Sequence, residues 1–101
     1  MKLISLKKST NPLKKYDVVI EHDGREKKVS FGAIHPDGTP YEDYTIHHDE
    51  ERKQRYIQRH KDKEDWTKSG ILTAGFWSRW LLWNKPTIRA SLEDIKSRFD
   101  L

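Results

Sequence analysis

Three arginines in the segment DEERKQRYIQRHK, residues 49–61, have the type and spacing that phosphate binding needs. Arg52, Arg55 and Arg59 stand at positions i, i+3 and i+7, so on a helix they fall within a stripe of about 60°. Each guanidinium is a planar fork that binds two phosphate oxygens at once. The alternative is a solvated helix face, because Glu51 precedes Arg55 by four residues and can neutralise it. Since the other two arginines lack such an acid, we expect the stripe to contact phosphate.

Three lysine pairs are further candidates for phosphate contact. They are Lys7-Lys8, Lys14-Lys15 and Lys27-Lys28. Lysines on a hairpin and on a basic N-terminal arm can follow a nucleic-acid backbone without reading its sequence. The alternative is that they protect edge strands, since adjacent strand residues point to opposite faces of a sheet.

The charge is spread unevenly along the chain of 101 residues, whose formal net charge is +4. Residues 1–34 carry +4, residues 35–66 carry −3 and residues 67–101 carry +3. Basic ends favour a polyanion as partner, although solubility alone explains the net charge equally well. Without cysteine there are no disulfides or thiolate metal sites, and no apolar run approaches the ~20 residues of a membrane span. We expect a soluble intracellular protein.

A metal site is not expected, although suitable side chains are present. His47, His48 and Asp49, together with Glu51 and His60, supply enough ligand types. Adjacent histidines on a strand diverge, however, and the chain has neither an HExxH motif nor a cysteine-histidine framework. The histidine pair is expected to belong to the turn into the basic helix, and we expect no cofactor.

Catalysis is not expected either. Glu26-Lys27-Lys28 matches the E-x-K half of one metal-dependent nuclease signature, but the one Pro-Asp pair, Pro36-Asp37, follows it in the wrong order. No hydrolytic triad and no glycine-rich phosphate loop stands out. We therefore predict that the protein is not an enzyme, with nuclease activity as the enzymatic alternative.

The first half of the chain predicts an antiparallel sheet. In YDVVIEHDGREKKVSF, two β-rich runs flank Asp23-Gly24, a pair suited to a type I′ hairpin turn. A two-residue turn places Val18 opposite Val29 and Tyr16 opposite Phe31. KLISLK, residues 2–7, is expected to form another strand, and residues 44–46 a short further one. We expect three to four strands.

The second half predicts about three helices, of which the arginine segment is the first. TAGFWSRWLLWN begins at a Thr73 cap, and its rings cover one broad face that favours burial in the core. Leu82 falls on the opposite face, so Leu82 and the neighbouring Trp83 are the candidates for an interface. A last helix begins at a Thr87 cap. We predict a single α+β domain over residues 1–101, with residues 1–46 mainly β and 49–99 mainly α.

The stretch from RYIQRHK through TAGFWSRWLLWNKPT to KSRF resembles a family of short proteins of nucleocytoplasmic large DNA viruses, including marseilleviruses, phycodnaviruses and mimivirus-like viruses. The resemblance covers an RxxYxxRH-like segment, a tryptophan, the TAGFWSRWLLWNKPT block and an FG pair like Phe31-Gly32. It implies a protein of the virion or of the virus factory in the host cytoplasm or nucleus, with affinity for viral DNA. Its basic helix maps onto Arg52, Arg55, Arg59 and His60.

Together these patterns favour one function and leave a second open. The first is largely sequence-independent binding of double-stranded DNA through its phosphate backbone, in genome organisation or packaging. No base-reading module is visible, and formation of a homodimer would add avidity. The alternative is a structural virion protein that binds another protein through the tryptophan-rich helix. In that case Leu82 and Trp83 matter more than the arginines.

Overall fold

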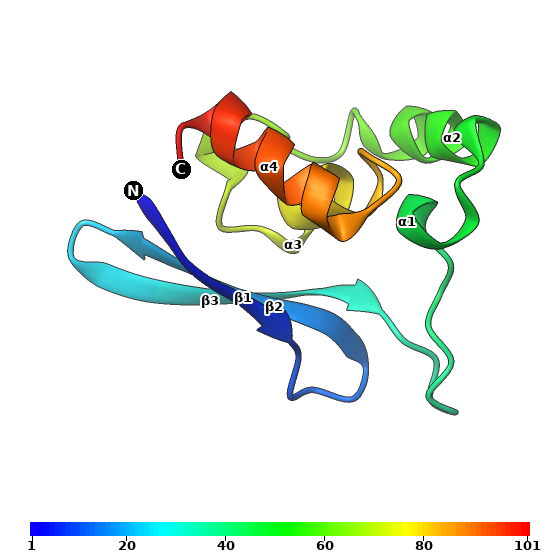
Figure 1. Ribbon diagram of the computed structural model, residues 1–101, viewed down its shortest axis with the longest axis horizontal. Helices are drawn as coiled ribbons and strands as arrows, with labels where there is room; N and C mark the ends of the chain where they lie inside the picture. Colours follow the sequence, from blue (N-terminus) through cyan, green and yellow to red (C-terminus); the bar gives the residue numbers. More distant parts are fainter.

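A three-stranded sheet lies under a layer of helices in the computed structural model, which describes all 101 residues (Figure 1). The strands are β1 (Lys2–Lys8), β2 (Lys14–His22) and β3 (Arg25–Ala33), in the antiparallel order β1-β2-β3. The helices are α1 (Tyr44–His47), α2 (Glu50–His60), α3 (Ala74–Trp77) and α4 (Ile88–Phe99). A 3-10 turn covers Lys68–Gly70 and a π-helical segment covers Ser78–Leu82. The predicted α+β class is confirmed.

The β2–β3 hairpin has the predicted register. Val18 pairs with Val29, and Tyr16 pairs with Phe31. The turn residues Asp23 and Gly24 have φ angles of 53° and 75°, as a type I′ turn requires. Because this register places apolar side chains on one face, the sheet has a side that the helices can cover.

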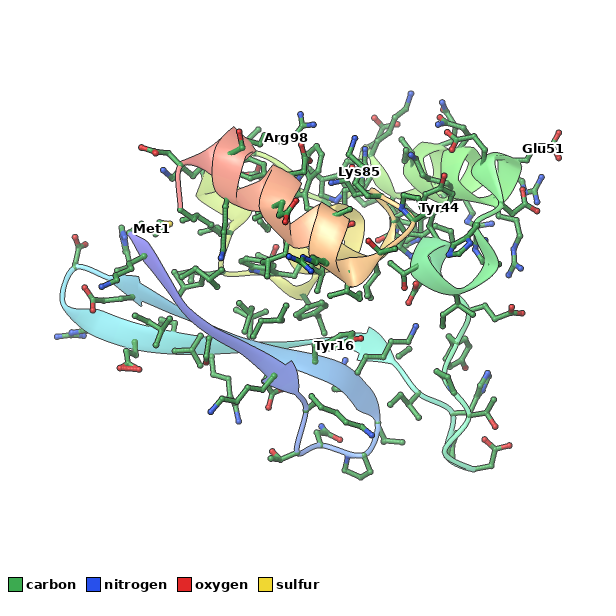
Figure 2. All side chains as sticks on the ribbon, in the orientation of Figure 1. Met1, Tyr16, Tyr44, Glu51, Lys85 and Arg98 are labelled. Atoms are coloured by element: carbon green, nitrogen blue, oxygen red, sulfur yellow. The ribbon has the colours of Figure 1, made fainter.

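One hydrophobic core joins the sheet to the helices, and side chains from both layers fill the space between them (Figure 2). At its centre Trp77 is fully buried, with its ring centroid 6.1 Å from that of Phe31. The indole Nε1 of Trp77 donates a 2.7 Å hydrogen bond to the carbonyl of Ile71. Trp80 and Trp83 are partly buried against the same core, which bears out a core role for most of the tryptophan block.

The segment around Tyr44 is helical, so the prediction of a short strand over residues 44–46 is wrong. It forms α1, because Asp43 accepts a 2.9 Å hydrogen bond from the backbone N–H of Thr45 as an N-cap. His48 then ends the helix in a left-handed conformation, with φ 54°. The two histidines thus form the turn into α2, as predicted.

The tryptophan segment begins at the predicted Thr73 cap, but it does not continue as an α-helix. After α3 it widens into the π-helical segment, where the N–H of Trp83 donates to the carbonyl of Ser78, five residues earlier, at 3.1 Å. The wider turn rotates Leu82 inward, and only 2% of this residue is exposed. The expectation that Leu82 faces outward as an interface residue is therefore wrong.

None of the helices has both the length and the apolar character that crossing a membrane demands.

Candidate functional site

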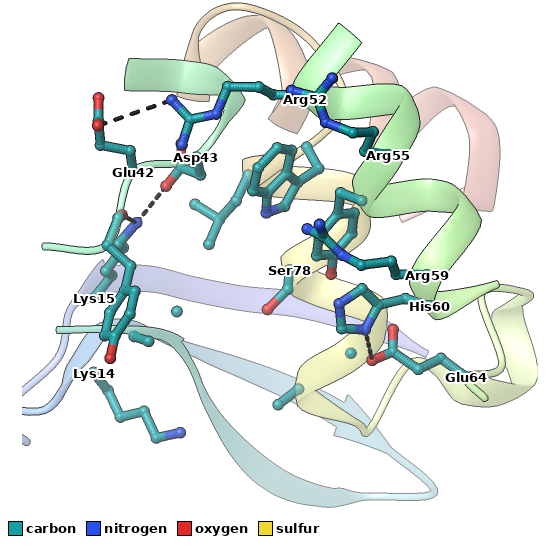
Figure 3. Close-up of a pocket in the computed structure, with 18 residues that line it drawn as sticks. Lys14, Lys15, Glu42, Asp43, Arg52, Arg55, Arg59, His60, Glu64 and Ser78 are labelled. Carbon is teal, nitrogen blue, oxygen red and sulfur yellow. Dashed lines mark hydrogen bonds and ion pairs between the residues drawn. The ribbon is translucent and has the colours of Figure 1, made fainter. Parts of the chain in front are cut away.

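A cleft of about 710 Å³ separates α2 from the end of the sheet where β2 begins and β3 ends (Figure 3). All three arginines of the predicted stripe line one wall. The opposite wall includes residues of β2, β3 and the segment before α1: Lys14, Lys15, Gly32, Ala33, Tyr41, Glu42 and Asp43. The remaining lining includes Glu64 after α2, the start of α3, and residues of the π-helical segment such as Ser78. The arginine stripe thus faces a concave surface.

Packing of a single tyrosine sets the rotation of α2 about its axis. Asp49 begins the helix, since its carboxylate accepts hydrogen bonds from the N–H groups of Glu51 and Arg52 at 3.0 and 3.3 Å. Tyr56, the one buried residue of α2, stacks on Trp83 with ring centroids 4.4 Å apart and an interplanar angle of 3°. With Tyr56 facing inward, its neighbouring arginine stripe is turned toward the cleft.

Acids compensate the arginines unequally. Arg52 lies 3.9 Å from Glu42, and Arg55 lies 3.9 Å from Glu51, whose side chain points away at the outer end of α2 and is 88% exposed (Figure 2). Ion pairs that are this long and this exposed contribute little to stability, so another anion can readily replace the carboxylate. Arg59 and Lys14 have no carboxylate within 4.0 Å. The cleft therefore holds two uncompensated cations.

Two hydroxyl groups in the cleft add hydrogen-bond donors. Tyr56 is 8% exposed, and its hydroxyl makes no hydrogen bond within the protein. Burial, reinforced by the nearby carboxylate of Glu64, raises the pKa of Tyr56 far above its ordinary value, so this hydroxyl remains a donor at physiological pH. Ser78 points its hydroxyl into the same space (Figure 3). Charge patterns do not reveal hydroxyl groups, so neither side chain was predicted as part of the site.

Lys15 lines the cleft but is not free to bind an anion. It is 9% exposed, and its ammonium lies 2.5 Å from the carboxylate of Asp43 and also donates to the backbone carbonyl of Tyr41. A buried lysine needs such a partner, because its desolvation costs several kcal/mol. The prediction that Lys15 binds phosphate is therefore replaced by a structural role: it joins β2 to the segment that begins α1.

Gly32 makes room for the path of Lys15. Gly32 has a φ of +79°, and a Cβ at this position would meet the Cβ of Lys15 at 2.8 Å. The glycine of the FG pair thus allows the lysine stem to cross the neighbouring strand. A glycine inside a strand often marks a place where another group packs closely against the backbone. Gly32 is therefore the sequence feature that indicates the burial of a neighbouring side chain, here that of Lys15.

Gly32→Ala should destabilise the protein by about 2 to 4 kcal/mol, because it combines positive-φ strain with overpacking against Lys15. Gly24→Ala is the matched control, since Gly24 also has a positive φ, +75°, but has nothing within 4 Å of the added Cβ. Urea unfolding of both variants measures the difference. Equal losses of unfolding free energy would show that the contact with Lys15 contributes nothing.

The remaining predicted lysines lie outside the cleft. Lys7, Lys8, Lys27 and Lys28 are exposed on β1 and β3, and none of them lines the cleft. Lys28 also lies 4.0 Å from Asp17. Of the three predicted lysine pairs, only Lys14 joins Arg59 as an uncompensated cation of the cleft.

The three histidines considered as metal ligands have other surroundings, and a ring nitrogen of His48 lies 3.1 Å from the carbonyl oxygen of Thr45. The ring of His47 packs against that of Trp83 with centroids 5.3 Å apart and an interplanar angle of 57°, and burial together with the charge of Arg52 lowers the pKa of His47. His60 lies 3.3 Å from Glu64. No three His, Cys, Asp or Glu side chains are grouped so that they could hold a metal ion.

The model of a family of unknown function, DUF5754, matches residues 4–60. The chain belongs to DUF5754. The matched residues include the whole β2–β3 hairpin, α1, α2 and therefore Lys14 and all three arginines of the cleft. The tryptophan block follows the matched region. No curated protein and no solved structure matches this DUF5754 chain.

Proposed function

We propose that the protein is a non-enzymatic, largely sequence-independent DNA-binding protein that contacts the phosphate backbone of double-stranded DNA with the α2 wall of the cleft. One observation carries this proposal: Arg59 and Lys14 approach the cleft from opposite sides, and neither has an acidic partner (Figure 3). Uncompensated cations around a concave surface concentrate the positive potential there. Phosphate is the anion that arginine forks bind with two hydrogen bonds.

The spacing of the arginines supports contact with a polymer. The axial rise from Arg52 to Arg59 is about 10 Å, from 1.5 Å per residue of helix. One strand of duplex DNA presents a phosphate about every 3.4 Å along its axis, so the stripe spans about three of them. Because these contacts involve no base edge, we expect weak sequence preference.

A role in a large DNA virus belongs to the same proposal. The resemblance of the tryptophan block supports a place in the virion or the virus factory, where backbone binding would serve genome organisation or packaging. The alternative of a protein-binding tryptophan helix has lost support, because Leu82 is buried and Trp83 is stacked on Tyr56 and packs beside His47.

Changing Arg52, Arg55 and Arg59 together to Ala should weaken binding to a random-sequence duplex about 100-fold at ~0.15 M salt. The reason is the loss of about three phosphate contacts, each of which adds about 0.9 to the slope of log affinity against log salt. Fluorescence anisotropy across a salt series measures both the affinity and the slope.

The control variant changes Lys7, Lys8 and Lys27 to Ala, which removes the same charge from outside the cleft. We expect a small effect from this variant. An equal loss from both triple variants, or duplex binding that is indifferent to salt, would refute the assignment of the cleft. Loss of intact DNA in the presence of Mg²⁺ would instead indicate a nuclease.

A further inference from the structure

We infer that the cleft accepts a single strand of nucleic acid in preference to a duplex, and that Tyr41 stacks on one of its bases. This inference rests on the proposed function, because the same arginines hold the phosphates. It adds a class of ligand and a base-contacting residue that the backbone contacts do not require. Single-strand binding combines a basic groove with an exposed aromatic ring, and both features are present here.

Tyr41 has the exposure that a stacking ring needs. It lines the cleft and is 50% exposed, although most large apolar and aromatic side chains of the protein are at least partly buried. One face of its ring stacks on His35, with centroids 3.6 Å apart and an interplanar angle of 23°. A ring that is covered on one side and half exposed overall keeps a face for a base.

The backbone around Tyr41 holds this ring in place before any ligand arrives. The N–H of Tyr41 donates to the carbonyl of Ala33 at 3.1 Å, and Ile34 and Pro40 form an isolated bridge. The carbonyl of Tyr41 accepts from the buried ammonium of Lys15. A ring fixed in this way loses little conformational entropy on binding, which favours affinity.

The lining of the cleft favours a single strand. A duplex presents its phosphates on a convex cylinder with its bases stacked inside, so it can meet the arginines of the α2 wall but offers Tyr41 no free base. Tyr56 and Ser78 also line the cleft, and their hydroxyls can donate hydrogen bonds to the phosphates of a strand that enters it. The cleft volume of about 710 Å³ lies in the range of small-ligand pockets, and a strand that enters can turn a base toward Tyr41.

Anisotropy titrations with four labelled probes of equal length test the inference: single-stranded DNA, single-stranded RNA, duplex DNA and a DNA strand without bases. We expect each base-containing single strand to bind at least about tenfold more tightly than the duplex. Tyr41→Ala should then weaken single-strand binding about five- to 100-fold, the range for loss of one base stack. It should leave duplex binding and binding of the base-free strand within about twofold.

Tyr41→Phe and Tyr41→Leu are the matched variants, since the first keeps an aromatic ring and the second keeps only the bulk. We expect Tyr41→Phe to bind like the wild type and Tyr41→Leu to bind like Tyr41→Ala, with thermal unfolding of all three close to that of the wild type. An effect of Tyr41→Ala on DNA but not on RNA, or the reverse, still supports stacking and identifies the sugar.

Two results would overturn the inference while leaving the proposed function intact. They are duplex binding as tight as single-strand binding, and an equal loss from Tyr41→Ala on strands with and without bases. Should the triple arginine variant bind all four probes as the wild type does, the proposed function fails as well.

Discussion

Asp43→Ala should lower the free energy of unfolding by about 3 to 5 kcal/mol, the usual cost of leaving one member of a buried ion pair without its partner. Asp43 is 2% exposed, and its carboxylate lies 2.5 Å from the ammonium of Lys15. The same carboxylate caps α1 through the N–H of Thr45. The change therefore removes a helix cap and leaves a buried cation, and urea unfolding followed by tryptophan fluorescence measures the sum.

Two further variants separate these contributions. Asp43→Asn keeps an acceptor for the helix cap but removes the charge. Its loss of unfolding free energy should therefore lie between zero and the loss from Asp43→Ala. In the double variant Lys15→Met/Asp43→Ala no buried charge lacks a partner, so the double variant should be more stable than the sum of the single losses predicts. If the losses of unfolding free energy from the two single variants simply added, Lys15 and Asp43 would not be energetically coupled. Glu51→Ala removes an acid whose side chain is 88% exposed, and it is the control for the loss of a negative charge alone.

Trp77→Ala should cost about 3 to 5 kcal/mol, the range for large aromatic deletions in a core. Trp77 is fully buried and packs against Phe31 and Phe76, with centroids 6.1 and 5.4 Å from its own. Few aliphatic side chains are available to fill the space, because the hydrophobic share of the chain is only 34%. The total stability of a domain of this size is about 5 to 15 kcal/mol, so this variant should unfold at a much lower temperature.

Trp77→Phe refines the comparison. It keeps a ring in the core but loses the hydrogen bond to the carbonyl of Ile71, so its cost should be well below that of Trp77→Ala. Leu13→Ala, at a residue that is 49% exposed, is the control for loss of apolar surface outside the core. A loss from Trp77→Ala no larger than that from Leu13→Ala would contradict the position of Trp77 in the structure. Calorimetry gives the three unfolding temperatures.

Local signals in the sequence were enough to predict most of the secondary structure. The Asp23-Gly24 turn determined the hairpin register, because a two-residue turn leaves one pairing of the flanking strands. Caps predicted at Thr73 and Thr87 marked the starts of two helices. The same kind of signal was present at Asp43 and was overlooked, since the β-prone residues after it suggested a strand.

The errors concern features that depend on tertiary contacts. Helical periodicity assumes 3.6 residues per turn, so it placed Leu82 on the surface, whereas the π-helical segment turns it into the core. Lys14 and Lys15 are adjacent residues of the same type, and contacts with the distant Asp43 and Gly32 distinguish Lys15. The arginine stripe was predicted as one face of a helix. Its position in a cleft depends on the stacking of Tyr56 on Trp83, a residue far from α2 in the sequence.

The loop between β3 and α1 is tied to the rest of the fold near both of its ends. The bridge between Ile34 and Pro40 closes the loop over the residues between them. The ion pair of Lys15 and Asp43 then holds the chain where the loop leads into α1. Lengthening the loop costs little, because each doubling of a flexible loop adds only about 0.6 kcal/mol. Loops of other lengths and aromatic content can therefore replace this one while the Lys15–Asp43 pair keeps its place in the fold.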